Sequence, residues 1–277
     1  MAPWRCPVAL DAAVVAMVSV FRHFPYKRMP LTDFAETLVP ETATNVDFAA
    51  PDPGRETTAP LLTPAQPKNR PPRIFIQAGG RSSRMGADKA WATLRDRPLI
   101  EHVIAAAAGV SDNITVVINP LNPARQRYAA LTARRAATAR ASNVADDLYQ
   151  DCGPLGGIYT ALTLLQPGEA ALMLACDTPF LSAAFLRLLW EQHQTHGAAL
   201  TIPLDAGNRA QMLTGVYTTA CRPHIARMLA WREYKVDRLP LRVPARFVTY
   251  REYQALPEAR RLLVNLNTPA DLRQHDA

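Results

Sequence analysis

Three positively charged side chains follow a glycine pair in one short stretch of the sequence. The apolar run at residues 74 to 76 predicts a buried strand. Gly79 and Gly80 after it let the backbone turn sharply and approach a ligand, because neither residue has a Cβ atom. Successive backbone N–H groups in such a turn can bind an anion. The charged side chains that add to this attraction are Arg81, Arg84 and Lys89. The stretch therefore predicts a loop that binds phosphate groups, such as those of a nucleoside triphosphate.

A carboxylate at the end of another buried strand could hold a metal ion. An apolar run over residues 171 to 176 ends at Asp177, which is followed by Thr178 and Pro179. Mg²⁺ prefers oxygen ligands and commonly bridges one or two carboxylates to substrate phosphates. The alternative is that Asp177 caps the helix predicted to begin near Ser182 or shapes the turn before Pro179. The phosphate-binding loop upstream favours the metal interpretation.

Acidic residues and a glycine-rich turn lie close together between residues 146 and 157. Asp146 and Asp147 end a predicted strand, and the turn Gly-Pro-Leu-Gly-Gly at residues 153 to 157 begins a predicted helix. Glycines permit a flat base to approach the backbone, and the start of a helix contributes partial positive charge. The stretch can therefore read the edge of a base, although it also suits an ordinary loop that leads into a helix.

The glycine pattern differs from the two better-known phosphate loops. It lacks the G-x-G-x-x-G spacing of a dinucleotide fold and the G-K-[ST] ending of a Walker loop. The block Gly-Gly-Arg-Ser-Ser-Arg-Met-Gly-Ala-Asp-Lys at residues 79 to 89 instead resembles the signature loop of nucleotidyltransferases that act on cofactors. Within these it is most similar to the molybdenum cofactor guanylyltransferase family, and the resemblance covers residues 73 to 275. Three departures are Gln77, where the family usually has Leu, Met212, where it usually has Pro, and a long N-terminal arm.

The resemblance implies a set of residues that bind the nucleotide. By position these are Gln77, Ala78, Gly79, Gly80, Lys89, Asn119, Asp147, Gly153, Pro154 and Leu155. Asp146 replaces Asp147 if the match shifts by one residue. Asp177 would bind the magnesium ion of the magnesium–nucleotide complex.

A second set of residues could reach the other substrate. The run Val-Asn-Leu-Asn-Thr-Pro at residues 264 to 269 is close to a family motif. Asn265 and Asn267 could contact a pterin phosphate, whereas Asn267 or Thr268 could instead cap a helix. Two further candidates for gripping that phosphate are Lys235 and Arg238, which also suit a solvated surface.

The reaction that the resemblance implies is transfer of GMP from GTP to the terminal phosphate of molybdopterin carrying molybdenum, with release of pyrophosphate. The attacking phosphate oxygen is already ionised, so positioning and charge neutralisation should dominate catalysis. In this hypothesis Asp177 holds Mg²⁺, Lys89 and Arg84 neutralise the leaving pyrophosphate, and the amides of Gly79 and Gly80 hold phosphate oxygens. These roles require Lys89 and Asp177 to converge in one pocket.

Two kinds of alternative remain open. One is a cytidylyltransferase that acts on the same pterin, or a sugar-phosphate nucleotidyltransferase, although the second glycine of the pair and the Gly-Pro-Leu-Gly-Gly turn favour guanine. The other is a noncatalytic GTP-binding regulator of molybdoenzyme maturation, with residues 1 to 72 as its partner-binding segment. The candidate protein partners are accordingly molybdenum-insertion and molybdoenzyme maturation proteins.

Composition divides the chain of 277 residues near Arg73. Half of the 24 prolines precede that residue, and residues 1 to 72 predict a disordered or weakly structured arm before a nucleotidyltransferase domain at residues 73 to 277. The whole net charge of +7 falls on the domain, which suits anionic small molecules better than nucleic acid, because no aromatic residues alternate with the basic ones. The four cysteines form no metal or disulfide pattern, which predicts a cytoplasmic protein.

The N-terminal apolar run, residues 8 to 21, is too short to cross a membrane. It suits a short amphipathic helix or a weak targeting sequence. A third interpretation is translated upstream sequence, with Met29 as the true start.

Short β-rich runs alternate with helical patterns after Arg73, which predicts a three-layer α/β/α domain with a mainly parallel, Rossmann-like sheet. The predicted strands are 73–78, 113–118, 141–145, 170–175, 198–203, 213–217 and 245–248. The predicted helices are 98–109, 122–133, 155–165, 182–196, 219–231 and 269–275. Such sheets bind ligands at the carboxyl ends of their strands, where the motifs above lie. His193 and His196 have no third metal ligand nearby and are interpreted as exposed residues at a helix end.

Overall fold

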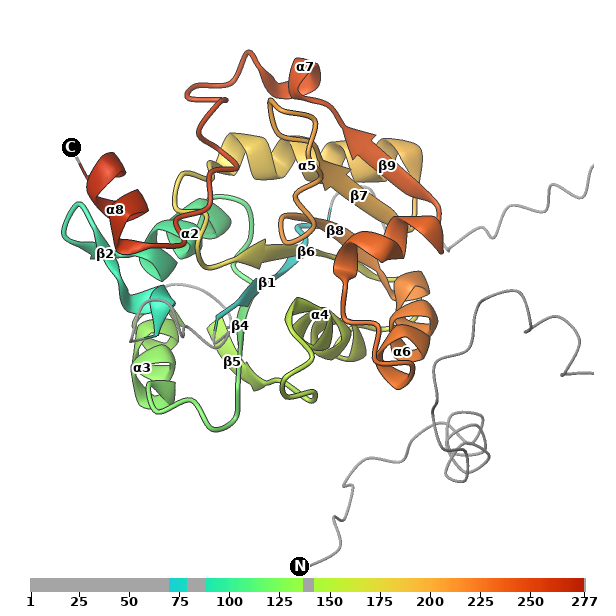
Figure 1. Ribbon diagram of the computed structural model, residues 1–277, viewed down its shortest axis with the longest axis horizontal. Helices are drawn as coiled ribbons and strands as arrows, with labels where there is room; N and C mark the ends of the chain where they lie inside the picture. The colour runs from blue at the N-terminus through green and yellow to red at the C-terminus, as the bar shows by residue number, and fades with distance from the viewer. Residues whose placement is uncertain (1–69, 79–87, 137–141, 277) are drawn as a thin grey trace, which may run out of the picture. The chain divides into compact units, whose positions relative to one another are not determined.

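One mixed sheet forms the centre of the structure, a computed structural model that describes residues 70–78, 88–136 and 142–276. Within these residues the sheet has seven strands in the order β5-β4-β1-β6-β8-β7-β9 (Figure 1). Their bounds are β1 Arg73–Gln77, β4 Ile114–Ile118, β5 Ser142–Asp146, β6 Ala170–Ala175, β7 Leu200–Pro203, β8 Gly215–Thr218 and β9 Ala245–Val248. A separate short hairpin pairs β2 (Thr93–Leu94) with β3 (Arg97–Pro98).

The sheet is mainly parallel, as the sequence predicts. β8 runs antiparallel to both of its neighbours, and the other pairings are parallel. The chain passes from β1 outward to β4 and β5, and then returns to place β6 on the other side of β1. The order of the strands therefore reverses between β1 and β6, and a ligand is expected at the carboxyl ends of these two strands.

Helices cover both faces of the sheet and complete three layers. α2 and α5 lie on one face, and α4 and α6 lie on the other (Figure 1). The α-helices are α2 Leu99–Ala108, α3 Arg125–Ala136, α4 Pro154–Thr163, α5 Ala183–His196, α6 Arg222–Ala230, α7 Tyr250–Tyr253 and α8 Pro269–His275. Short 3₁₀ turns are η3 Lys89–Trp91, η4 Thr219–Cys221 and η5 Val236–Leu241.

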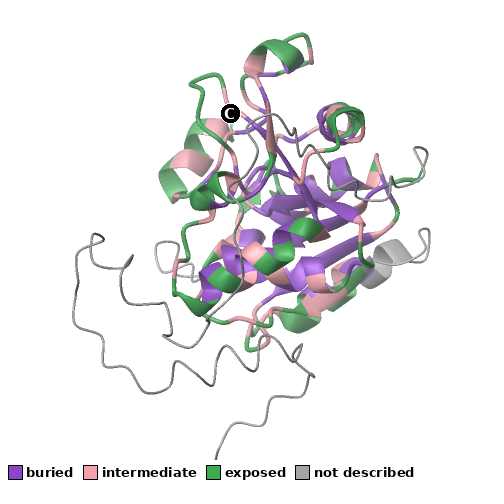
Figure 2. Cartoon of the chain, turned by 90° about the vertical axis from the view of Figure 1, so that its right-hand side faces the viewer, coloured by how far each residue is buried: buried purple, intermediate pink, exposed green. Residues whose placement is uncertain are grey.

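Alternation along the strands fills the space between the layers. In β1, Ile74 and Ile76 join the cluster under α2 and α5, whereas Phe75 joins the cluster under α4 and α6. All three side chains are fully buried, and the sheet is the most buried layer (Figure 2). Each such residue contributes about 1.5–3 kcal/mol relative to an exposed position. Gln77 has the same parity as Phe75 and so lies on the face of α4.

The predicted strands and longer helices are all present, with shifts at their ends. The helix predicted at 122–133 begins three residues later, because Asn122 forms a turn in which its Oδ1 atom accepts from the backbone of Ala124 at 2.8 Å. The prediction for His193 is wrong, because this residue is buried beside Trp190 on the inner face of α5. Burial lowers the pKa of His193 to about 4, so the ring is neutral at physiological pH.

Most of the predicted N-terminal arm falls outside the described residues. Its last residues pack on the domain, where Pro72 is buried and Arg70 pairs with Glu169 at 3.2 Å. The division of the chain at Arg73 stays a prediction. No helix in the described part of the chain is long and apolar enough to cross a bilayer.

Candidate functional site

The ammonium group of Lys89 joins two segments that are far apart in the sequence. Its Nζ atom lies 2.6 Å from Oδ2 of Asp177 and 2.6 Å from Oδ1 of Asn267. Lys89 begins η3 shortly after β1, and Asp177 lies just after β6. Because β1 and β6 are adjacent and parallel, both residues lie at the same edge of the sheet. The structure thus brings Lys89 and Asp177 into direct contact, and a shared pocket that holds the phosphates between them stays a prediction.

Asp177 keeps one carboxylate oxygen for a further ligand. Its Oδ1 atom is buried and has no hydrogen-bond partner among the described residues, although buried oxygens normally have one. Within the same residues, no group of three His, Cys, Asp or Glu side chains could hold a metal ion. Asp177 therefore fits Mg²⁺ as a single protein ligand, because this ion commonly takes its other ligands from phosphates and water.

The capping alternative for Asp177 is wrong. Ser182 caps α5 itself, since its Oγ atom accepts from the backbone N–H of Phe185 at 3.2 Å. The main chain of Asp177 instead holds the C-terminal segment, because its carbonyl oxygen accepts from the N–H of Leu266 at 2.9 Å. This bond lies directly before Asn267 and brings that residue to the site.

Asn267 and Thr268 have separate tasks. Thr268 is the N-cap of α8, and its side chain accepts from the N–H of Asp271 at 3.1 Å in a reciprocal capping box. The side chain of Asn267 is left to contact Lys89. Backbone N–H donors from Asn267 and Thr268 lower the pKa of Asp271, which keeps this cap ionised.

Asp88 is a site residue that the sequence analysis missed. Its Oδ2 atom accepts hydrogen bonds from Nδ2 of Asn122 at 2.9 Å and from the hydroxyl of Tyr128 at 2.7 Å. Its Oδ1 atom accepts from the N–H of Ala90 at 3.2 Å and caps η3. The only local signal is the position of Asp88 directly before Lys89, because both anchoring partners lie on a later segment of the chain.

The thiol beside Asp177 is unsuited to nucleophilic catalysis. Cys176 is buried, and this burial, followed by the nearby carboxylates of Asp177 and Asp88, raises the pKa of its thiol well above the ordinary range. The residue therefore stays protonated at physiological pH. It contributes packing below Lys89 and Asp177.

Gln77 lies against the first turn of α4, on the predicted base side of the site. A Cβ atom added to Gly157 would meet the Cδ atom of Gln77 at 3.0 Å and its Oε1 atom at 3.2 Å. The glycine therefore makes room for the glutamine side chain. Nε2 of Gln77 is buried and has no hydrogen-bond partner among the described residues. An unpaired buried amide at this position is an unused donor beside the Gly-Pro-Leu-Gly-Gly turn.

Asp147 holds the loop before α4 in place. Its Oδ1 atom lies 2.8 Å from the hydroxyl oxygen of Thr160 and accepts from the N–H of Tyr149 at 3.1 Å. Burial raises the pKa of Asp147, and these hydrogen bonds partly offset that shift. Asp146, the alternative candidate, forms an ion pair with Arg125 at the outer edge of the sheet. Asp147 is thus the acid on the side of α4.

The turn before α4 presents backbone groups, not side chains. Gly153 has φ 61° and ψ −155°, a conformation that is essentially confined to glycine. Pro154 occupies the first turn of the helix, and the side chain of Leu155 is fully buried in the core. Any contact of Gly153 or Leu155 with a nucleotide must therefore come from the main chain, whereas the ring of Pro154 is partly exposed.

Asn119 shapes a turn at the end of β4. Its Oδ1 atom accepts from the N–H of Leu121 at 2.8 Å. This arrangement is an Asx turn, so the side-chain oxygen already has a local role. The nearby Asn122 is the residue that reaches Asp88.

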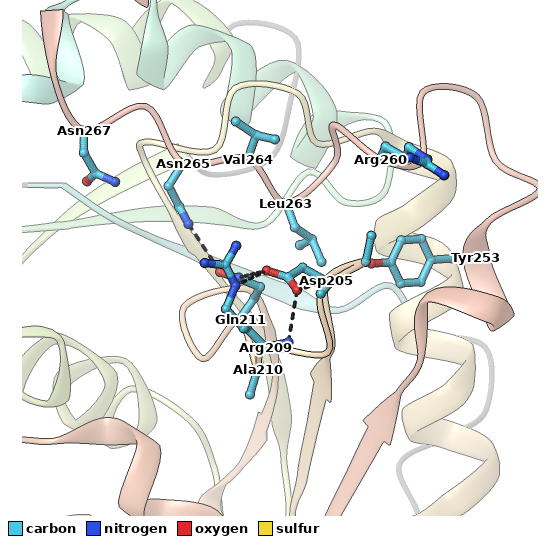
Figure 3. Close-up of a pocket in the computed structure, with 13 residues that line it drawn as sticks. Asp205, Arg209, Ala210, Gln211, Tyr253, Arg260, Leu263, Val264, Asn265 and Asn267 are labelled. Atoms are coloured by element: carbon cyan, nitrogen blue, oxygen red, sulfur yellow. Dashed lines mark hydrogen bonds and ion pairs between the residues drawn. The ribbon is translucent and has the colours of Figure 1, made fainter. Parts of the chain in front are cut away.

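A polar cavity adjoins the site beside the C-terminal segment. It has a volume of about 560 Å³, and its lining includes Asn265 and Asn267 (Figure 3). Asn265 donates from Nδ2 to Oε1 of Gln211 at 3.3 Å, and Gln211 donates from Nε2 to Oδ2 of Asp205 at 3.0 Å. Asn267 lines the cavity and also contacts Lys89, so the cavity and the Lys89–Asp177 pair are neighbours.

Charged groups of both signs lie around this cavity. Burial alone would raise the pKa of Asp205, but the backbone N–H groups of Arg209 and Gly207 and the Arg209 guanidinium lower it overall. Arg209 and Arg260 are exposed cations at the rim. Lys235 and Arg238 are exposed on η5 and its N-cap, and neither lines the cavity.

A model of the MobA-like NTP transferase domain matches residues 74–240. The chain belongs to this family. Among its relatives is a probable molybdenum cofactor guanylyltransferase of Flavobacterium johnsoniae, 30% identical over 198 residues that cover 72% of this chain and 93% of the relative. A protein of Halalkalibacterium halodurans with the same name is 31% identical over 201 residues, which cover 72% of this chain and 94% of that protein.

A solved structure shows the same fold. The molybdopterin-guanine dinucleotide biosynthesis protein A of Archaeoglobus fulgidus aligns with a TM-score of 0.61 and 20% sequence identity, covering 74% of this chain and 96% of that one. At this identity the likeness concerns the fold alone. The mainly parallel sheet between helical layers is thus the architecture of MobA-like transferases.

Part of the predicted phosphate loop of this MobA-like transferase lies outside the described residues. These predicted residues are Gly79, Gly80, Arg81 and Arg84. Ala78, at the start of the loop, is buried, and its N–H donates to the carbonyl oxygen of Val117 at 2.9 Å. The described ends of the loop are Ala78, which follows β1, and Asp88, which precedes η3.

Proposed function

We propose that this protein transfers GMP from GTP to the terminal phosphate of molybdopterin carrying molybdenum and releases pyrophosphate. The observation that carries the proposal is the contact of Lys89 with Asp177 and Asn267 beside a polar cavity. A cation and a carboxylate meet there at the edge of the sheet where such folds bind ligands. The curated relatives, which are named for this activity, support it.

The proposed reaction is an in-line displacement. A phosphate oxygen of the pterin attacks the α-phosphorus of GTP, a new P–O bond forms, and the bond to the β-phosphate oxygen breaks. Bound Mg²⁺ would neutralise phosphate charge as a Lewis acid. Lys89 neutralises negative charge that builds up on the leaving pyrophosphate, and Arg84 is proposed to act with it.

The ion pair between Lys89 and Asp177 keeps both charged groups in place for the nucleotide. Their side chains are only 15% and 20% exposed, so the pair is shielded from most of the solvent. In the nucleotide-free site each group neutralises the other. In a complex with magnesium and nucleotide, Asp177 would hold the cation and Lys89 would pair with the phosphates, so neither charge would be left unpaired.

The nucleotide base is proposed to lie between Gln77 and the turn at Gly153–Leu155. Main-chain groups of the turn would read the base edge, and Asp147 would keep the loop in place through Thr160 and Tyr149. Asn119 would border the nucleotide at the end of β4. The unpaired Nε2 atom of Gln77 supplies a donor that a purine acceptor can use.

The cavity beside Asn265 and Asn267 is the proposed site of the second substrate. Its lining offers amide donors and acceptors for a polar ring system. At the rim Arg209 pairs with Asp205, and the exposed Arg260 adds positive charge that suits a phosphate. Lys235 lies outside the lining, so its contact with that substrate is the part of the proposal with least structural support.

Turnover of GTP by the purified protein tests the proposal. The reaction contains Mg²⁺ and the molybdenum-loaded pterin, and pyrophosphate release is measured. GTP should be consumed and CTP should be a much poorer substrate in a parallel reaction. Faster turnover of CTP would make the protein a cytidylyltransferase, and GTP binding without pyrophosphate release would make it a noncatalytic regulator.

The setting of the reaction follows from the same proposal. The cysteines at positions 152, 176 and 221 are free, which is consistent with a reducing compartment such as the cytoplasm. Association with molybdenum-insertion and molybdoenzyme maturation proteins stays a prediction from the family resemblance.

A further inference from the structure

Asp88 links η3, which begins at Lys89, to α3 and the segment before it. Its carboxylate accepts three hydrogen bonds, one from Ala90 within η3 and two from Asn122 and Tyr128 on the segment around α3. We infer that Asp88 is a positioning residue that fixes Lys89 in its working place. The inference rests on the proposed function, because that function gives Lys89 its task.

Tyr128, the partner of Asp88 on α3, is shielded from solvent. Tyr128 is fully buried, and burial, followed by the Asp88 carboxylate, raises the pKa of its hydroxyl well above the ordinary value. The phenol therefore remains a donor to Asp88 at every physiological pH. The ring of Tyr128 packs on Trp91 of η3, with ring centroids 5.0 Å apart. The guanidinium of Arg127, which like Tyr128 lies on α3, is 4.0 Å from the centroid of the Trp91 ring.

Lys89 is thereby held at both ends. Asp88 is the N-cap of η3 and fixes the peptide from which Lys89 projects. At the other end, Asp177 and Asn267 hold the ammonium group. A lysine side chain loses rotamer freedom when it is fixed, so a site that needs the ammonium group at one point gains from a backbone that is already held in place.

Hydrogen bonding also prevents Asp88 from competing for the lysine. A free carboxylate next in sequence could pair with the ammonium and draw it away from the phosphates. Here both oxygens of Asp88 already accept hydrogen bonds from uncharged groups, which stabilise the carboxylate and fix its orientation. Lys89 contacts Asp177 and Asn267 and, in the proposed reaction, the leaving pyrophosphate.

Tyr128→Phe is the most direct test, because it removes one anchoring bond and keeps the ring that packs on Trp91. Tyr217→Phe is the matched control, since Tyr217 is also fully buried and its hydroxyl donates to the carbonyl oxygen of Met212 within the core. Tyr128→Phe should lower kcat for GTP roughly 10- to 100-fold, because a misplacement of about 1 Å can cost this much. The KM for GTP should change much less than kcat, and Tyr217→Phe should retain kcat.

A second measurement follows Lys89 without any turnover. Brief acylation of the intact protein with an amine reagent, read by peptide mass spectrometry, compares Lys89 with the exposed Lys235 as an internal reference. Lys89 should react several-fold faster relative to Lys235 in Tyr128→Phe than in the wild-type protein. If the hydroxyl only stabilises the fold, both variants will lose stability and the labelling ratio will stay constant.

An exchange of partners distinguishes positioning from general damage. Asp88→Asn and Asn122→Asp should each lower kcat. The first variant places an amide opposite the amide of Asn122, and the second places a carboxylate opposite the carboxylate of Asp88. The double variant restores one amide and one carboxylate and should recover at least part of kcat and of Lys89 protection. Unchanged kcat and labelling in Tyr128→Phe, or no recovery in a folded double variant, would overturn the inference. Absence of pyrophosphate release by the wild-type protein would instead refute the proposed function, while the labelling still tests the position of Lys89.

Discussion

Replacing Gln77 with leucine should stabilise the protein and weaken its grip on the purine base. Nε2 of Gln77 is buried without a hydrogen-bond partner among the described residues, so the folded protein carries a desolvated donor. Leucine has a similar volume and no polar atom. Gln77→Leu should therefore keep the packing against Gly157 and remove the cost of that donor.

The changes in stability and in affinity for GTP can be measured separately. An unpaired buried donor costs about 1–3 kcal/mol, and the lower half of this range applies because Gln77 as a whole is only half-buried. A gain of about 1.5 kcal/mol raises the Tm of a domain of this size by roughly 3–6 °C. A neutral hydrogen bond to the base contributes about 0.5–1.5 kcal/mol, so the affinity for GTP should fall roughly two- to tenfold.

Thermal unfolding without nucleotide and calorimetric titration with GTP and CTP measure the two effects. Gln192→Leu is the matched control, because Oε1 of Gln192 accepts from Nη2 of Arg246 at 3.0 Å and its amide is thus partnered. This control should not raise Tm and should leave GTP affinity unchanged. A lower Tm for Gln77→Leu would show that its amide is satisfied in solution, and equal affinity of variant and wild type for GTP would remove Gln77 from base recognition.

Four further results are expected. Lys89→Met should lower kcat for GTP by roughly 10²–10³-fold with the fold retained by circular dichroism, whereas Arg187→Met, at an exposed position on α5, should not; near-normal turnover would exclude Lys89 from the mechanism. Asp177→Ala should abolish Mg²⁺-dependent pyrophosphate release, and a fully active variant would contradict its metal role. Gly153→Ala should cost about 1–3 kcal/mol in urea unfolding despite the open space around it, because its φ and ψ suit only glycine, and an unchanged midpoint would refute that strain. Burial lowers the pKa of His193 to about 4, so the unfolded state binds a proton at this ring before the folded state does. The protein should therefore lose up to about 3 kcal/mol of stability as the pH falls from about 6.5 towards 4. In His193→Gln the free energy of unfolding should depend much less on pH over this range, as measured by urea unfolding.

Local signals in the sequence were sufficient for the strands of the sheet. β6 is a run of six buried residues, and β4 is a run of five, each bounded by turn residues. Such apolar runs are rarely exposed, because exposure would lose the free energy that burial of their side chains contributes. The mainly parallel direction then followed from the alternation with helices, whereas the order of the strands came only from the structure.

Elements that lack a local signal were missed. The β2–β3 hairpin turns at Arg95 and Asp96, whose φ values of 49° and 59° are normally supplied by Asn or Gly. Its turn is supported from the far end of the chain, where Oδ1 of Asp276 accepts from the N–H of Arg95 at 2.6 Å. A contact over that separation cannot be inferred from residue types nearby.

His193 shows the opposite case, in which a local signal existed and was not used. The buried residues Leu186, Leu189 and Trp190 precede it by seven, four and three positions. That spacing places His193 on the inner face of the helix, whereas its polarity suggested the outside. Periodicity was the better guide, because a neutral imidazole can be buried at moderate cost.

The C-terminal motif explains why residue type alone could not assign the site. Both Asn267 and Thr268 suit a helix cap, and the sequence left the choice open. In the folded protein Thr268 and Asp271 satisfy the first turn of α8 between them. Because the cap does not use the side chain of Asn267, the amide oxygen of that side chain can reach Lys89, 178 residues away in the sequence. The helix that ends the fold is therefore also what supplies the third member of the candidate site, and a change that loosens its cap should reach Lys89 through Asn267.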